Sequence, residues 1–85
     1  MNSNKQNLIN KIKYRSHYRG TKEMDKLIGR FVQKNINNFN EIQLKELEKF
    51  LDIDDANLYN FYNGFECDIE IKKSKISLLF KNFKF

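Results

Sequence analysis

Apolar side chains recur at steps of three and four residues along most of this 85-residue chain, and this spacing limits the fold more than any other feature. The repeat is clearest over residues 21–37, where the apolar positions are Met24, Leu27, Ile28, Phe31 and Val32. Such spacing gathers these side chains on one side of an α-helix. Similar stripes predict three further helices, over residues 5–17, 40–51 and 54–63.

The expected helix ends carry clear capping signals. Asn40 can accept at the start of the third helix, and Gln43 three residues later can reach back to it in a capping box. Asp54 stands in the same position for the fourth helix, which is expected to stop at Gly64 because glycine readily ends a helix.

The last segment, residues 68–83, fits both a helix and an alternating strand pattern. Four helices with short connections leave no partner strand, so we expect a fifth helix over 68–83. The absence of proline and the presence of only three glycines argue against a loop-rich chain. The expected fold is therefore all-α, a compact bundle of about five short helices in a single domain, residues 1–85.

Charge is divided into three blocks along the chain. Residues 1–34 carry nine basic side chains and two acids, residues 35–71 carry nine acids and two lysines, and residues 72–85 carry five lysines and no acid. The two basic blocks could bind phosphates, so a small nucleic-acid-binding module is one interpretation. The acidic middle block and the lack of a helix with a row of base-reading side chains argue against it.

Catalytic and metal-binding patterns are missing from the sequence. His17 is the only histidine and Cys67 the only cysteine, so no nucleophilic triad and no multi-cysteine metal site can be built. The acids near Asp54 lack the ligand spacing of a calcium loop and are better explained as helix caps. We therefore expect no enzyme activity and no metal. The absence of a signal peptide or membrane-spanning run predicts a cytoplasmic protein.

One polar cluster, at the first turn between helices, has the character of a partner-binding site. Its candidate residues are Arg15, Tyr18, Arg19, Gly20, Glu23 and Asp25. Arginine offers a planar fork of donors that matches a carboxylate or phosphate, and glycine lets a partner approach the backbone closely. The alternative is a solvent-exposed turn in which Arg19 and Glu23 form a weak surface pair.

Residues 13–16 (Lys-Tyr-Arg-Ser) and 19–27 (Arg-Gly-Thr-Lys-Glu-Met-Asp-Lys-Leu) resemble the succinate dehydrogenase flavin assembly factors, the SdhE/Sdh5 family. The hallmark of that family is Arg-Gly-x-x-Glu, here Arg19, Gly20 and Glu23. The resemblance continues through the leucine and phenylalanine positions of 44–51 and through 55–61, so it covers about residues 10–64. The chain departs from the family at Tyr18, where an arginine is frequent, and at Thr21, where a methionine is common.

The resemblance implies a small helical factor that binds the flavoprotein subunit of succinate dehydrogenase and promotes its covalent FAD attachment. The fumarate reductase flavoprotein is a second candidate partner. Arg19, Gly20 and Glu23 would contact the flavoprotein, with Asp25 as a weaker candidate, and the factor itself would hold no cofactor tightly. The alternatives are the nucleic-acid module or a general protein-interaction module. A monomer is expected, although the charge pattern also permits a dimer.

Overall fold

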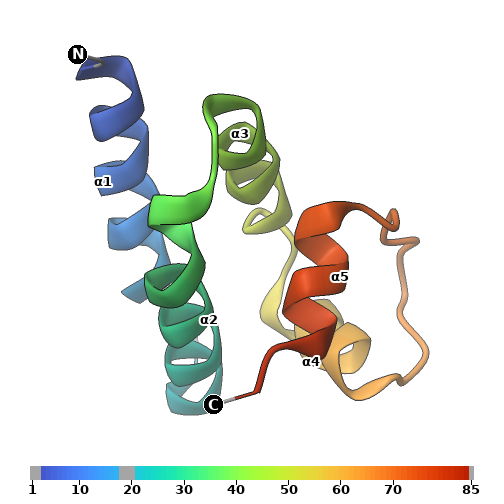
Figure 1. The fold of residues 1–85 in the computed structure, drawn as a ribbon. Helices are drawn as coiled ribbons and strands as arrows, with labels where there is room; N and C mark the ends of the chain where they lie inside the picture. The colour runs from blue at the N-terminus through green and yellow to red at the C-terminus, as the bar shows by residue number, and fades with distance from the viewer. Residues whose placement is uncertain (1–2, 18–20, 85) are drawn as a thin grey trace.

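The computed structural model describes residues 3–17 and 21–84, and these residues form helices and connections without a strand (Figure 1). The all-α prediction is therefore confirmed. The elements in chain order are α1 (Ser3–His17), α2 (Lys22–Asn35), the 3₁₀ helix η1 (Ile36–Asn38), α3 (Glu41–Phe50), α4 (Asp55–Asn63) and α5 (Lys75–Asn82).

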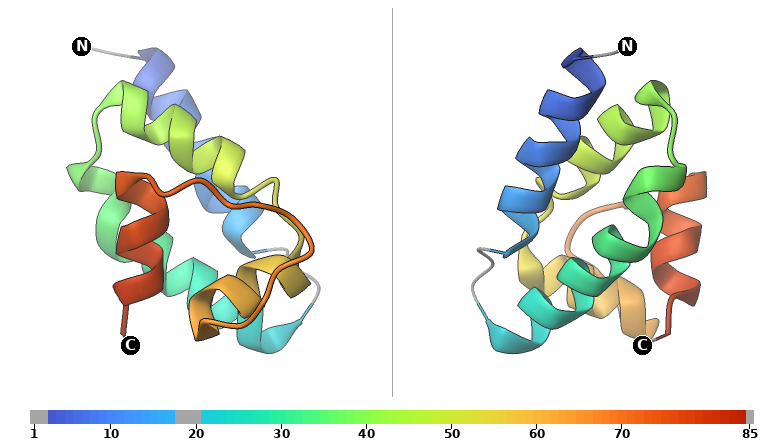
Figure 2. Two further views of the ribbon diagram at one scale, coloured as in Figure 1. Left: turned by 90° about the vertical axis from the view of Figure 1, so that its right-hand side faces the viewer. Right: turned by 60° about the vertical axis from the view of Figure 1, so that its left-hand side comes forward.

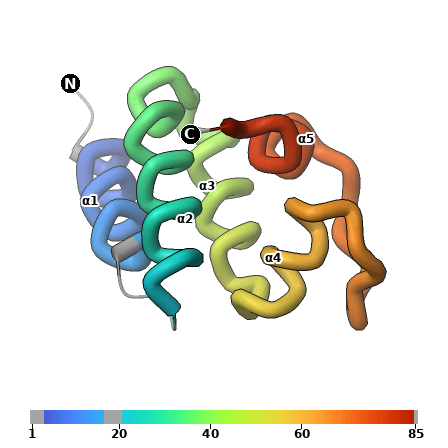
Figure 3. Tube along the Cα trace, turned by 90° about the horizontal axis from the view of Figure 1, so that it is seen from below, coloured from blue at the N-terminus to red at the C-terminus, as the bar shows by residue number. Residues whose placement is uncertain are grey.

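The helices form two groups that share α3. Helix α1 packs along α2 and against α3, while α5 packs against both α3 and α4. Seen from below, α1, α2 and α3 follow one another across the molecule, and α4 and α5 lie beyond α3 (Figure 3). The connection from α4 to α5 runs around the outside of the bundle (Figure 2).

The capping signals in the sequence act as predicted. Asn40 accepts a hydrogen bond from the backbone N–H of Gln43 at 2.8 Å, and the Gln43 side chain accepts from the backbone N–H of Asn40 at 2.9 Å. Asp54 caps α4 by accepting from the backbone N–H of Asn57. Gly64 ends α4 with φ = 76°, a left-handed conformation that glycine adopts without strain.

The predicted helix over residues 68–83 is wrong in its first half, because α5 begins only at Lys75. Ser74 and Ser77 cap this start reciprocally: the Ser77 N–H donates to the Ser74 hydroxyl, and the Ser74 N–H donates to the Ser77 hydroxyl at 2.7 Å. Further upstream, the side-chain oxygen of buried Asn57 accepts from the backbone N–H of Asp68 at 2.9 Å. This bond holds the connection against α4, so the apolar alternation before Ser74 belongs to an irregular segment.

Phe80 of α5 lies at the centre of the hydrophobic core. It is fully buried, and its ring centroid lies 5.3 Å from those of Phe31 in α2, Phe50 in α3 and Tyr62 in α4. Edge-to-face and tilted contacts of this kind add to the stabilisation that burial supplies. One side chain therefore joins four helices.

We expect Phe80→Ala to lower the free energy of unfolding by about 3–5 kcal/mol, because it removes a buried ring and leaves a cavity between these helices. Urea unfolding followed by circular dichroism measures the loss. Leu78→Ala, on the exposed side of the same helix, should cost less than about 1 kcal/mol. Equal losses for the two variants would contradict the central role of Phe80.

Candidate partner-binding site

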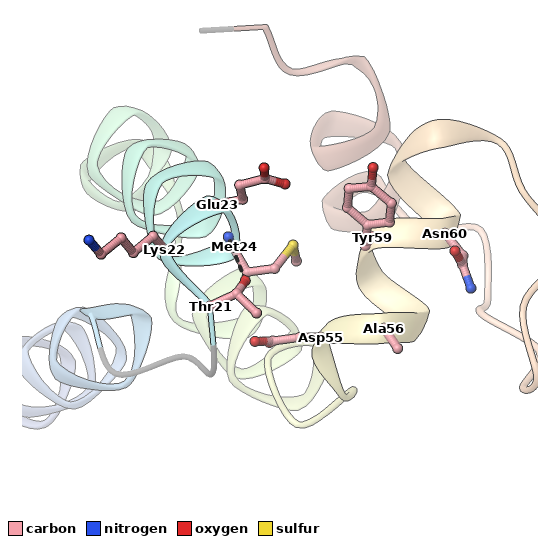
Figure 4. Close-up of a pocket in the computed structure, with 8 residues that line it drawn as sticks. All are labelled: Thr21, Lys22, Glu23, Met24, Asp55, Ala56, Tyr59 and Asn60. Carbon is pink, nitrogen blue, oxygen red and sulfur yellow. Dashed lines mark hydrogen bonds between the residues drawn. The ribbon is translucent and has the colours of Figure 1, made fainter.

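A groove lies between the N-terminal half of α2 and the exposed face of α4 (Figure 4). It has two adjoining parts of about 560 Å³ and about 200 Å³ that share Glu23, Met24 and Tyr59. We call it the α2–α4 groove. Its remaining lining residues are Thr21, Lys22, Lys26 and Leu27 on the α2 side and Asp55, Ala56, Asn60, Tyr62 and Asn63 on the α4 side.

The α2 wall is positioned by a cap at Thr21. The Thr21 hydroxyl accepts from the backbone N–H of Met24 at 3.2 Å, so the helix begins at Lys22. Glu23 then lies exposed in the first turn, where the helix dipole favours a negative charge. Thr21, which departs from the family pattern, thus has a local structural role as the N-cap.

The α4 wall is positioned by Asp54 and Asn57. The Asn57 amide donates to the Asp54 carboxylate at 2.7 Å, and this bond, with the backbone N–H of Asn57, lowers the pKa of Asp54 below its ordinary value of 3.8. One helical turn further on, Tyr59 is 42% exposed and its ring packs against that of Phe65 at a centroid distance of 6.5 Å. The cap and this aromatic contact present Tyr59 to the groove.

The groove combines an apolar floor with walls that carry both carboxylates and lysines. The Met24 side chain extends toward α4, and the Tyr59 ring faces back toward α2 (Figure 4). Asp55 extends from the first turn of α4 toward Thr21, whereas Lys22 points away from α4. An exposed aromatic ring beside a thioether and carboxylates suits contact with another protein.

Among the predicted site residues that the structure describes, one lines the groove and two do not. Glu23 lines the groove, while Asp25, in the same first turn of α2, is half-buried and is not among the groove-lining residues. Arg15 forms an ion pair with Asp52 within the chain. The predictions for Tyr18, Arg19 and Gly20 fall outside the described residues.

The site prediction lacked the α4 wall. The family resemblance over residues 55–61 already contained Asp55, Ala56 and Asn60, but nothing in the sequence indicated that they would face Glu23. Tyr59 could have been found, because it has no place on the apolar stripe of its helix.

Two further features are absent from the part of the chain that the structure describes. No group of three or more histidine, cysteine or acidic side chains lies close enough together there to hold a metal ion. None of the helices in residues 3–17 and 21–84 combines the length and the apolar character that crossing a bilayer requires. Cys67 is half-buried, with its sulfur 3.5 Å from the Asn57 carbonyl oxygen.

The comparisons with known proteins identify the family. Residues 10–83 match the Sdh5 family, described as flavinator of succinate dehydrogenase, and the chain belongs to that family. A relative from Arabidopsis thaliana, named succinate dehydrogenase assembly factor 2, mitochondrial, is 34% identical over 58 residues, or 68% of this chain. The chain spans about a third (31%) of the length of that relative. No solved structure matches the chain.

The lowered pKa of Asp54 predicts a pH dependence for the stability of the α4 wall. A carboxyl whose pKa is lower in the folded state stabilises fully above its unfolded value, near 3.8, and this contribution is lost as the pH falls through the folded value. Asp54→Asn keeps a capping oxygen but cannot titrate. We therefore expect the gap in unfolding free energy between wild type and Asp54→Asn to change between pH 5 and pH 3, with the wild type losing more on acidification.

Urea unfolding at several pH values measures that gap. A constant gap across this range would mean that Asp54 has the same pKa in the folded and unfolded chains.

Proposed function

We propose that this chain binds the flavoprotein subunit of succinate dehydrogenase through the α2–α4 groove and through Arg19 and Gly20, and thereby promotes covalent attachment of FAD to that subunit. One observation carries the proposal. Two segments that carry the family resemblance, residues 21–27 and 55–61, are about 30 residues apart in the sequence, yet both contribute walls to one groove. Membership in a family of succinate dehydrogenase flavinators supports the choice of partner.

The groove suits binding better than catalysis. It is lined by the side chains of Met24 and Tyr59 together with the carboxylates of Glu23 and Asp55, and none of its described lining residues is a histidine or a cysteine. A factor with such a surface can act by binding one arrangement of a larger partner more tightly than the others, which raises the population of that arrangement. On this proposal the flavoprotein supplies the reacting groups, and the factor stabilises the arrangement in which they meet.

FAD is then cargo of the partner and has no tight site on this chain. A dinucleotide pyrophosphate is usually held by backbone N–H groups and cations at a glycine-rich helix start. The α2–α4 groove instead has Glu23 and Asp55 among its lining residues, and the Lys22 side chain points away from α4 (Figure 4). The exposed Glu23 carboxylate on the α2 wall would repel a pyrophosphate, so we expect the groove to favour a basic or hydrogen-bond-donating protein surface.

Covalent flavin on the partner tests this proposal directly. A succinate dehydrogenase flavoprotein is expressed in cells without their own assembly factor, and flavin fluorescence is read on a denaturing gel. We expect a fluorescent band with the wild-type chain and a band at least several-fold weaker with Arg19→Ala/Glu23→Ala. The reason is that these changes remove the charged groups expected to pair with the partner.

The single variant Glu23→Gln has a matched control in Glu41→Gln. Both glutamates are exposed and lie in the first turn of a helix, so both substitutions remove one negative charge and the same kind of dipole interaction. Only Glu23 lines the groove. Equal flavin bands in every lane, with the partner folded and FAD supplied, would refute the maturation role.

A further inference from the structure

The two walls of the groove have little direct contact with each other. Among the described residues, the most extensive helix contacts are those of α1 with α2 and α3, of α2 with η1, and of α5 with α3 and α4. The pair α2 and α4 is not among them. The spacing between α2 and α4 is therefore set indirectly. One series of contacts that can set this spacing leads from α2 to α1, from α1 to α3, and from α3 through its connection to α4.

An ion pair connects α1 directly to the segment between α3 and α4. Arg15, two residues before the end of α1, binds the carboxylate of Asp52 in the connection between α3 and α4. The Arg15 side chain is 32% exposed and that of Asp52 is 64% exposed. Shortly after Asp52 the chain enters α4 at Asp55, which lines the groove, and α1, which carries Arg15, packs along α2, the other wall.

We propose that Arg15 is a positioning residue, which acts through Asp52 to hold the two walls of the α2–α4 groove at the spacing that the flavoprotein recognises. This inference rests on the proposed function and gives Arg15 an internal role in place of direct partner contact. Arginine suits the task because its planar fork fixes the direction of the carboxylate as well as its distance. Lysine would keep the charge but not the geometry.

The chain contains a matched control. Lys11 lies one helical turn before Arg15 on α1, and its amino group is 2.9 Å from the carboxylate of Glu48, which lies one turn before Asp52. Both pairs join α1 to the α3 side of the molecule. Lys11 and Glu48 both lie inside helices, in α1 and α3. Asp52 lies in the segment that leads into α4, so of these two pairs only Arg15–Asp52 reaches the segment next to a groove wall.

Affinity for the purified flavoprotein is measured by titration with the 85-residue chain and its variants. We expect Arg15→Ala and Asp52→Ala each to weaken binding about fivefold, which corresponds to about 1 kcal/mol. Lys11→Ala should stay within about twofold of wild type, and Arg15→Lys should restore only part of the loss. The double variant Arg15→Ala/Asp52→Ala should bind no more weakly than either single variant, because the two residues act as one unit.

A second measurement gives the distance between the two groove walls in the absence of the partner. Spin labels at Lys22→Cys and Ala56→Cys, in a Cys67→Ser background, report the distance distribution between the two walls. We expect Arg15→Ala to broaden or shift this distribution, and Lys11→Ala to leave it unchanged. An unchanged distribution in Arg15→Ala would overturn the inference.

The outcomes also separate this inference from the proposed function. If Glu23→Gln weakens binding while Asp52→Ala does not, the groove binds the flavoprotein but the positioning role of Arg15 is refuted. Additive losses from Arg15 and Asp52 would likewise refute it, because they would mean that Arg15 contacts the partner itself. If the wild-type chain fails to bind the flavoprotein, the proposed function fails, and the spin-label distances alone then decide whether Arg15 sets the groove.

Discussion

The packing of Phe80 against three other rings is the interaction on which the rest of the structure depends. A chain of this size has room for one modest core, so a single well-placed aromatic side chain carries a large share of the packing. By touching Phe31, Phe50 and Tyr62, the Phe80 ring sets α5 against α2, α3 and α4 together. The Tyr62 hydroxyl reinforces this arrangement by donating to the Phe83 carbonyl oxygen at 2.6 Å.

The α2–α4 groove exists because α2 and α4 are joined through α5 more than directly to each other. Helices α2 and α4 both reach α5 through aromatic rings, but they make few contacts with each other, so their exposed N-terminal turns stand apart. The space between them exposes Tyr59 and the Glu23 carboxylate. A binding surface built from the gap between two helices needs a separate means of holding its width, and the Arg15–Asp52 pair lies where such a constraint would act.

Most of the fold could be predicted because its signals are local. Helix period, the Asn40 and Asp54 caps and the Gly64 stop each depend on residues within a few positions of one another. The α5 prediction failed because the first half of residues 68–83 is held by a distant side chain: Asn57 binds the Asp68 backbone, and such a bond leaves no periodic trace in the sequence. The site prediction found Glu23 because its motif is local. It missed the α4 wall because that wall meets α2 only in the folded chain.

The sequence by itself determined the helical class, most helix ends and, through its motifs, the family, because each of these depends on the order and spacing of nearby residues. The monomeric state and the cytoplasmic location stay predictions. Only the tertiary structure decided that residues 21–27 and 55–61 share a groove and that Arg15 is paired with Asp52, 37 positions away. The physical reason is that both depend on how α1, α3 and α5 pack, and the free energy of that packing comes from buried side chains far apart in the chain.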